Sequence, residues 1–179
     1  MKASGQASVK ASDVWAMSAS ERLACLRGGG PVTAERLAGA DYRGVSLGLP
    51  ALAERLTWKT FRKSFRRDAD GGVSGLNVRL VQTGVEGATT PRRDRRGDVV
   101  SFGPFAVVPL PAGGTPFGCE EGVVFDYGAR HPAWHPIGLT RDVVVALDAD
   151  HALLLGALYV EVAGRGLRTP SFFTLERER

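Results

Sequence analysis

The last third of the chain contains three short apolar runs separated by turns, and this pattern constrains the fold more than any other feature. Residues 142–147 are a compact valine-rich run, residues 153–162 form a second run, and residues 171–177 close the chain. Short turns between apolar runs predict adjacent antiparallel strands, that is, a meander. A meander that continues to the terminus must protect its edges, and closure into a barrel removes them completely.

Further strands are predicted upstream. Residues 41–47 read as the first strand, and residues 58–67 and 73–83 read as the arms of a hairpin. The sequence between these arms, residues 68–72, is a turn in which glycine supplies positive φ. A helical interpretation of residues 58–67 is weaker, because their aromatic residues would fall on the side opposite the apolar face of residues 49–56. Residues 99–110 and 122–127 complete the predicted sheet.

Three short helical segments are predicted before the hairpin. Ser18 and Glu21 fit a capping box at a helix start, and Thr33 begins a shorter helical turn. Pro50 suits the first turn of a helix that ends near Thr57. The predicted fold is therefore mostly β: a closed or nearly closed antiparallel barrel of about seven or eight strands, with the helices packed against one end. Residues 12–179 would form this single domain, preceded by a flexible arm at residues 1–11.

Composition agrees with an ordinary globular domain. The 179 residues suffice for one core, and 44% hydrophobic with 23% charged residues is typical of soluble proteins. The chain begins without an apolar leader and has no apolar run of about 18 residues, so we predict a soluble, cytoplasmic protein. Cys25 and Cys119 have no metal-ligand spacing, and reduced thiols are favoured over a disulfide. We predict no metal and no cofactor.

One group of candidate catalytic residues lies in an irregular segment. Asp126 precedes two histidines, His131 and His135, that are four residues apart. On a helix this spacing could share a metal, but the neighbouring prolines argue against a helix there. A general-base role for a histidine is somewhat better supported, because imidazole titrates near neutral pH. A structured loop beside the barrel mouth is favoured over both.

Two basic clusters suggest a different class of function. Lys59, Arg62, Lys63, Arg66 and Arg67 alternate with aromatic residues, and the second cluster holds four arginines: Arg92, Arg93, Arg95 and Arg96. Cations beside aromatic rings can bind nucleic acid or an anionic membrane surface. On a strand, however, neither face of the first cluster is cleanly apolar, so a solvated outer face is favoured. Nucleic-acid binding is disfavoured, since no known binding module accompanies the charges.

The second arm of the hairpin leaves the barrel interior open to two interpretations. If Asn77 and Arg79 point inward, the interior holds an amide and a fixed cation that could bind a carboxylate or phosphate. In the favoured alternative, Arg79 faces water, and Leu76, Val78 and Leu80 fill the core, because arginine is rarely buried unpaired.

The two ends of the domain resemble a known group of barrels. Residues 39–44 read Gly-Ala-Asp-Tyr-Arg-Gly, and the chain closes with Phe-Phe-Thr-Leu-Glu-Arg at residues 172–177. Together they resemble small bacterial calycin-like (lipocalin-like) barrels, the group named after its Gly-x-Trp-x-Gly motif and its companion domain of unknown function. In calycins a tryptophan ring packs across the barrel base under a basic side chain from the last strand. Here Tyr42 replaces the tryptophan, one residue further from Gly39, and Arg177 could cover it.

The resemblance implies binding of a small hydrophobic or amphipathic molecule, anionic ones included, inside the barrel. The expected polar anchors are Arg62, Asn77, Arg79 and Tyr127. One alternative is a cofactor-independent enzyme of the isomerase, cyclase or hydratase type that uses Asp126, His131 or His135 in the same cavity. A third is a basic interaction module, which requires both arginine-rich clusters to lie on one surface. The sequence does not indicate an oligomeric state.

Overall fold

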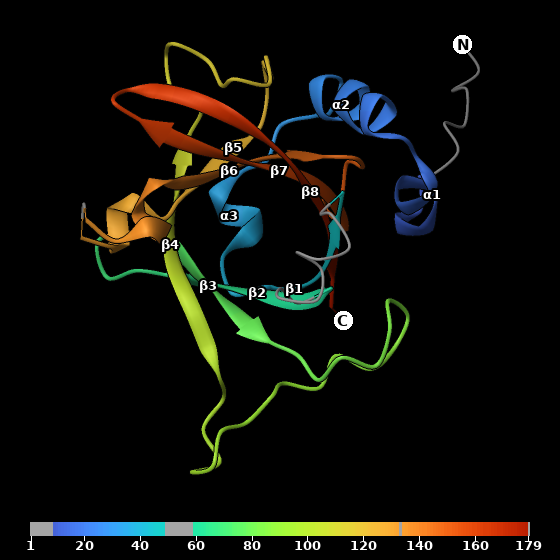
Figure 1. Ribbon diagram of the computed structural model, residues 1–179, viewed down its shortest axis with the longest axis vertical. Coiled ribbons are helices and arrows are strands. Elements are labelled where there is room, and N and C mark those ends of the chain that lie inside the picture. Colours follow the sequence, from blue (N-terminus) through green and yellow to red (C-terminus); the bar gives the residue numbers. More distant parts are fainter. Residues whose placement is uncertain (1–8, 49–58, 133, 179) are drawn as a thin grey trace.

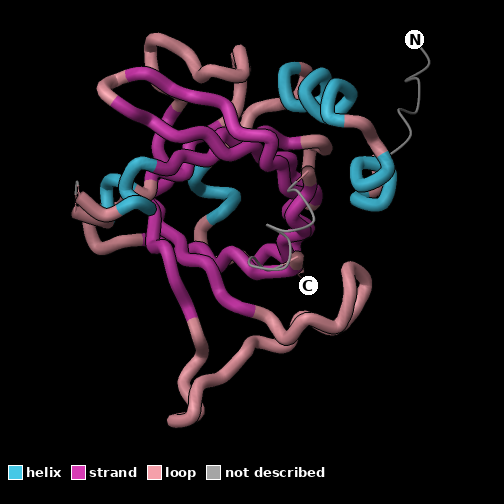
Figure 2. Tube along the Cα trace, in the orientation of Figure 1, coloured by secondary structure: helices cyan, strands magenta, loops and turns pink. Residues whose placement is uncertain are grey.

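The computed structural model describes residues 9–48, 59–132 and 134–178, and within these ranges the chain forms a closed antiparallel barrel (Figure 1; Figure 2). Each strand pairs with its neighbours in sequence order, which is the up-and-down arrangement found in lipocalins. The strands are β1 (Asp41–Leu47), β2 (Thr60–Arg67), β3 (Val73–Arg79), β4 (Ser101–Pro109), β5 (Val123–Asp126), β6 (Thr140–Ala146), β7 (Leu153–Val162) and β8 (Arg165–Arg177). The predicted barrel class is confirmed.

The last strand closes the barrel against the first. β8 pairs antiparallel with β1 over six residue pairs that begin at Tyr42 and Arg177. These are the two residues that the resemblance to calycins placed together. The Tyr42 ring is fully buried, and its hydroxyl donates a 2.9 Å hydrogen bond to the carbonyl oxygen of His151. One phenol therefore connects the first strand to the turn between β6 and β7.

The hairpin at β2 and β3 forms as the turn sequence predicted. Asp68 donates its backbone N–H to the Gly72 carbonyl oxygen at 2.8 Å, and Gly71 adopts φ of 88°. β2 begins at Thr60, and Trp58 lies outside the described residues, as does the helix predicted after Pro50. The strand interpretation of the basic, aromatic segment is thus correct for its described part.

The N-terminal helices take two positions. α1 (Ala11–Ala16) and α2 (Ala19–Arg27) pack on the outer wall, whereas α3 (Ala34–Leu37) lies within the ring of strands in the view of Figure 1. The Ser18–Glu21 capping box is present, with Glu21 donating its N–H to the Ser18 hydroxyl at 3.3 Å. Of the three α-helices in the described part of the chain, α3 alone matches the prediction that helices pack against one end. No helix among the described residues is long and apolar enough to cross a membrane.

Two apolar layers stabilise the barrel. The inner layer consists of interior side chains such as Phe65, Phe105 and Phe125, joined at one end by Leu37 of α3. The outer layer joins α1 and α2 to β1, β6, β7 and β8 through buried residues such as Val14, Leu26 and Val145. The helices thus cover the apolar outer faces of those strands, which would otherwise be exposed to water.

The two ends of the barrel differ in how they are filled. The end that holds α3 and the β2–β3 turn is packed with apolar side chains, including Leu37, Tyr42 and Leu175. The opposite end carries the β3–β4 and β5–β6 connections, and the latter contains the short 3₁₀ turns η1 (Gly128–Arg130) and η2 (Pro136–Leu139). Polar side chains enter the interior on the side of this second end, and the candidate site lies there.

Candidate functional site

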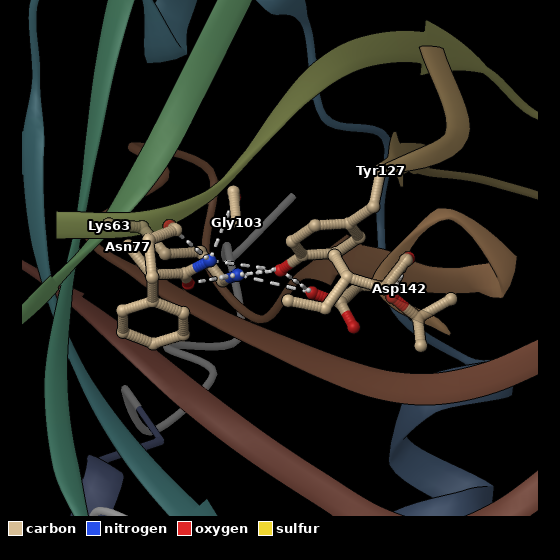
Figure 3. Close-up of polar contacts among 8 residues, drawn as sticks. Lys63, Asn77, Gly103, Tyr127 and Asp142 are labelled. Atoms are coloured by element: carbon tan, nitrogen blue, oxygen red, sulfur yellow. Dashed lines mark hydrogen bonds and ion pairs between the residues drawn. The ribbon is translucent and has the colours of Figure 1, made fainter. Parts of the chain in front are cut away.

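A lysine is buried inside the barrel. Lys63 is 2% exposed and lies on β2 between Phe61 and Phe65, on the face that points inward. Its Nζ donates hydrogen bonds to Asn77 Oδ1 at 2.9 Å, to the Tyr127 hydroxyl at 2.7 Å and to Asp142 Oδ2 at 3.1 Å (Figure 3). These contacts come from β3, from the residue after β5 and from β6. Three strands and the residue that follows a fourth, all distant from one another in sequence, therefore build one polar cluster.

The cluster is almost completely hydrogen-bonded. An ammonium group has three protons, and Lys63 uses all three. The Tyr127 hydroxyl donates to Asp142 Oδ2 at 2.9 Å and accepts from the Asn77 side-chain amide at 3.3 Å. Asn77 also donates to the Gly103 carbonyl oxygen at 3.1 Å. Asp142 Oδ1 is the exception, because it is buried and has no hydrogen-bond partner among the described residues.

Burial and charge set the protonation tendencies of the cluster. Burial lowers the pKa of Lys63, and the neighbouring Asp142 carboxylate opposes this effect only in part. Burial and the same carboxylate raise the pKa of Tyr127 well above its ordinary value. Tyr127 is thus held as a neutral hydroxyl that donates a hydrogen bond, and Lys63 gives up its proton more readily than a lysine in water.

Aromatic rings surround the Lys63 ammonium. Its Nζ lies 4.7 Å from the ring centre of Phe105, and the rings of Phe61, Phe125, Tyr127 and Phe173 lie between 5.3 and 5.6 Å away. The negative faces of such rings attract a cation. The rings thus offset part of the cost of removing the ammonium from water.

Glycines opposite the aromatic residues make room for three of these rings. Gly44 is the cross-strand partner of Phe61, Gly75 of Phe105 and Gly156 of Phe173. A Cβ added at any of these glycines would lie within 2.5 Å of the opposing ring. Each ring therefore occupies the space over its glycine, where a side chain would clash with it.

A cavity of about 260 Å³ opens beside the cluster. Its wall is mostly apolar, with Phe61, Phe102, Ile137, Leu158 and Phe173 as the large contributors. The polar contributors are Ser46, Lys63, Asn77, Tyr127, Thr140, Asp142 and Ser171. An apolar space with a few converging polar groups is the usual form of a small-molecule site.

Two of the predicted ligand anchors reach this cavity. Asn77 and Tyr127 both line it and belong to the polar cluster. The face of β3 that carries Asn77 points inward, so Leu76, Val78 and Leu80 do not line the cavity, although Val78 and Leu80 are buried as the alternative expected. The fixed cation, however, is Lys63, because Arg79 lies at the rim beside Arg92, Arg93 and Arg95 and does not line the cavity.

Arg62 lies on the outside of the barrel. It is adjacent to the inward-facing Lys63 on the strand and therefore points the other way. Its guanidinium forms a 2.7 Å ion pair with Glu178 and lies 3.7 Å from Asp41. It also donates to the Thr89 carbonyl oxygen at 3.0 Å. These contacts tie the β3–β4 connection and the end of the chain to the outer wall.

The three predicted catalytic residues are not brought to the cavity. Asp126 lies outside the barrel, where it forms a 3.0 Å ion pair with Arg141 and accepts the Ala129 N–H. The His131 and His135 rings stack with centres 5.0 Å apart, and His135 Nδ1 accepts the Ile137 N–H in the η2 turn. These contacts organise the β5–β6 connection. Among the described residues there is no cluster of three or more metal-binding side chains.

The basic residues of the hairpin do not gather on one surface with the arginines of the β3–β4 connection, although Arg62 contacts this connection through the Thr89 carbonyl oxygen. Lys63 is buried, so its assignment to a solvated outer face is wrong. Arg66 lies near Asp68 at the β2–β3 turn, which is at the α3 end, whereas Arg92, Arg93 and Arg95 lie at the opposite end. This separation counts against one continuous surface for nucleic acid or membrane.

Lys63 is the residue that the sequence analysis missed. Phe61, Lys63 and Phe65 alternate on one strand face, and two phenylalanines on that face were a signal that it points to the core. Asp142 begins a valine-rich strand and gave a similar signal. Nothing in the sequence paired these two residues, because they are 79 positions apart.

Comparison with known proteins adds the following. No family model and no curated protein matches the chain. Among solved structures, a protein from Thermomonospora curvata is 19% identical, with a TM-score of 0.46; the match covers 91% of this chain and 100% of that one. A second is the siderocalin Ex-FABP, which is described as functioning through dual ligand specificities. It is 12% identical, with a TM-score of 0.38 and coverage of 80% of this chain and 71% of that one.

Proposed function

We propose that this protein binds a small hydrophobic or amphipathic molecule in the cavity beside Lys63. The observation that supports the proposal is the combination of an apolar wall with a buried polar cluster at one end of a closed barrel. Burial of apolar surface supplies most of the binding free energy, and the polar groups orient the ligand.

The volume limits the size of the ligand. A cavity of about 260 Å³ is larger than the roughly 150 Å³ that accepts benzene and smaller than the roughly 300–1,000 Å³ of pockets for drug-sized ligands. A compact molecule with one ring, or a short branched chain, fits this space. A long acyl chain does not.

The charge of the cluster limits the polarity of the ligand. Lys63 and Asp142 neutralise each other, and every Lys63 proton is already donated. A ligand carboxylate would thus lose its hydration without gaining an unpaired cation. We therefore favour a neutral ligand over an anionic one, within the broader class that the resemblance to calycins implies.

The test is calorimetric titration with four ligands of matched size: toluene, benzyl alcohol, benzoate and benzylamine. We expect toluene and benzyl alcohol to bind more tightly than benzoate and benzylamine, because neither ion finds an unpaired counter-charge. The variant Ile137→Trp replaces an aliphatic side chain of the cavity wall by a bulky indole ring and should abolish binding. Leu139→Trp, on the exposed side of the same turn, is the matched control. Equal binding by the two variants, or no binding of any probe to the parent protein, would reject the proposal.

A further inference from the structure

The buried lysine has the surroundings of a reactive amine. Lys63 lines the cavity among apolar side chains, and its nitrogen lies within hydrogen-bond distance of both a phenol and a carboxylate. Lysines desolvated in apolar pockets are the ones that form imines with carbonyl compounds. We propose that Lys63 forms a reversible imine with a small aldehyde held in the cavity. This inference rests on the proposed binding function and specifies the ligand class.

The neighbours of Lys63 have suitable positions for each proton transfer. Asp142 Oδ2 lies 3.1 Å from Nζ and can accept a proton from the ammonium, which leaves a neutral amine with a free lone pair. Tyr127 lies 2.7 Å from Nζ and donates to the same carboxylate oxygen. Its raised pKa keeps the phenol protonated. Asp142 Oδ1, which has no partner among the described residues, gives the carboxylate a second acceptor position.

The reaction balances without any added reagent. The amine attacks the aldehyde carbon, a C–N bond forms, and the carbonyl oxygen takes a proton from Tyr127, which is replenished from Asp142. Asp142 then removes the extra proton from nitrogen and returns it to the carbinolamine hydroxyl, which leaves as water. The nitrogen lone pair forms the C=N bond. The products are a protonated imine, one water molecule and an Asp142 carboxylate that pairs with the new cation.

The cavity supports this chemistry in two further ways. The surrounding rings lie 4.7–5.6 Å from Nζ and stabilise a cation at this point, whether ammonium or iminium. The apolar wall excludes bulk water, which slows hydrolysis of an imine once formed. Together with the cavity volume, these features select a compact, apolar aldehyde, for which benzaldehyde is a suitable probe.

The experiment traps the imine by reduction. The whole 179-residue chain is incubated near neutral pH with benzaldehyde and cyanoborohydride, and the adducts are mapped by peptide mass spectrometry. The chain has only four lysines, Lys2, Lys10, Lys59 and Lys63, so each site is resolved. We expect more adduct on Lys63 than on Lys10 and Lys59 together. Adduct only on the other lysines, or equal labelling of all, would overturn the inference.

Three variants separate the causes. Lys59→Arg should leave Lys63 labelling unchanged, Ile137→Trp should abolish it, and Tyr127→Phe should slow it, with folding of each checked by circular dichroism. Toluene, which cannot react, separates this inference from the proposed function. Toluene binding without a Lys63 adduct would reject the imine alone, whereas failure of both toluene binding and labelling would reject the proposed function as well.

Discussion

At the scale of single residues, Lys63 and Asp142 are the most unusual pair in the molecule. Both are at most 3% exposed, and their ion pair spans 3.1 Å inside an otherwise aromatic interior. Replacing a buried ion pair by neutral groups often costs little, whereas removing one partner leaves an uncompensated charge. We therefore expect the net contribution of the pair to stability to be small, and the loss of one partner alone to be costly.

This asymmetry gives the first prediction. Lys63→Met leaves the Asp142 carboxylate buried without a counter-charge and should lower the free energy of unfolding by about 3–5 kcal/mol. The double variant Lys63→Met/Asp142→Asn removes both charges and should be more stable than Lys63→Met alone. Urea unfolding followed by circular dichroism measures both. A double variant that is less stable than the single variant would show that Asp142 is not made unfavourable by loss of its partner.

At the scale of elements, paired strands shape the cavity through glycine–phenylalanine pairs. β1 presents Gly44 to Phe61, and β7 presents Gly156 to Phe173. Both phenylalanines line the cavity. The space for a ligand thus depends on where these two pairs of strands lack a side chain.

The second prediction concerns Gly156. A Cβ at this position would lie 2.2 Å from the Phe173 ring, so Gly156→Ala must push the ring into the cavity. We expect a loss of about 1–3 kcal/mol in unfolding free energy from overpacking, together with weaker toluene binding. The control is Gly113→Ala, because a Cβ there meets no atom within 4 Å. Unchanged toluene affinity in the Gly156→Ala variant would contradict this account of the cavity.

The strands were predictable from the sequence, but the site was only half predictable. Alternating patterns and turn residues located the first strand, the β2–β3 hairpin and the three closing strands, since these signals are local. Asn77 and Tyr127, two of the four predicted ligand anchors, line the cavity. The role of Lys63 was missed because its charge favoured an exposed position, although the alternating pattern of its strand favoured the interior. Its partners could not be predicted, because they depend on the register of strands across the barrel. Asp126, His131 and His135 were predicted as catalytic candidates because of their chemical type, but their contacts organise the β5–β6 connection.

At the scale of the whole molecule, the three tyrosines of the chain lie in three different packed regions. Tyr42 fills the α3 end of the barrel, Tyr127 lies in the polar cluster, and Tyr159 belongs to the outer apolar layer. Burial raises the pKa of each, and that of Tyr159 rises to about 12. Ionisation of the three tyrosines at alkaline pH therefore reports on the packing of all three regions.

The third prediction is cooperative alkaline unfolding. A tyrosine whose pKa is raised by folding stabilises the native state fully below the unfolded value near 10, and this contribution is lost as pH rises above it. Lys63 acts in the opposite sense, because its lowered pKa makes stability rise with pH until the unfolded value of 10.5 is passed. Above that value Lys63 no longer contributes, and the raised pKa values of the tyrosines should make the free energy of unfolding fall toward pH 12. Burial also raises the pKa of Cys119, which acts in the same sense, whereas it lowers the pKa of Arg22, which acts in the opposite sense.

Tyrosinate absorbance and circular dichroism measure this transition together. If all three hydroxyls are protected by the fold, tyrosinate should form in one step that coincides with the loss of the β-sheet signal. Tyr159→Phe removes one protected group and should make the decline of stability with pH less steep in the range from about 10 to 12. Stepwise ionisation of the tyrosines while the β-sheet signal stays native would show that at least one of these regions opens to water independently of the barrel.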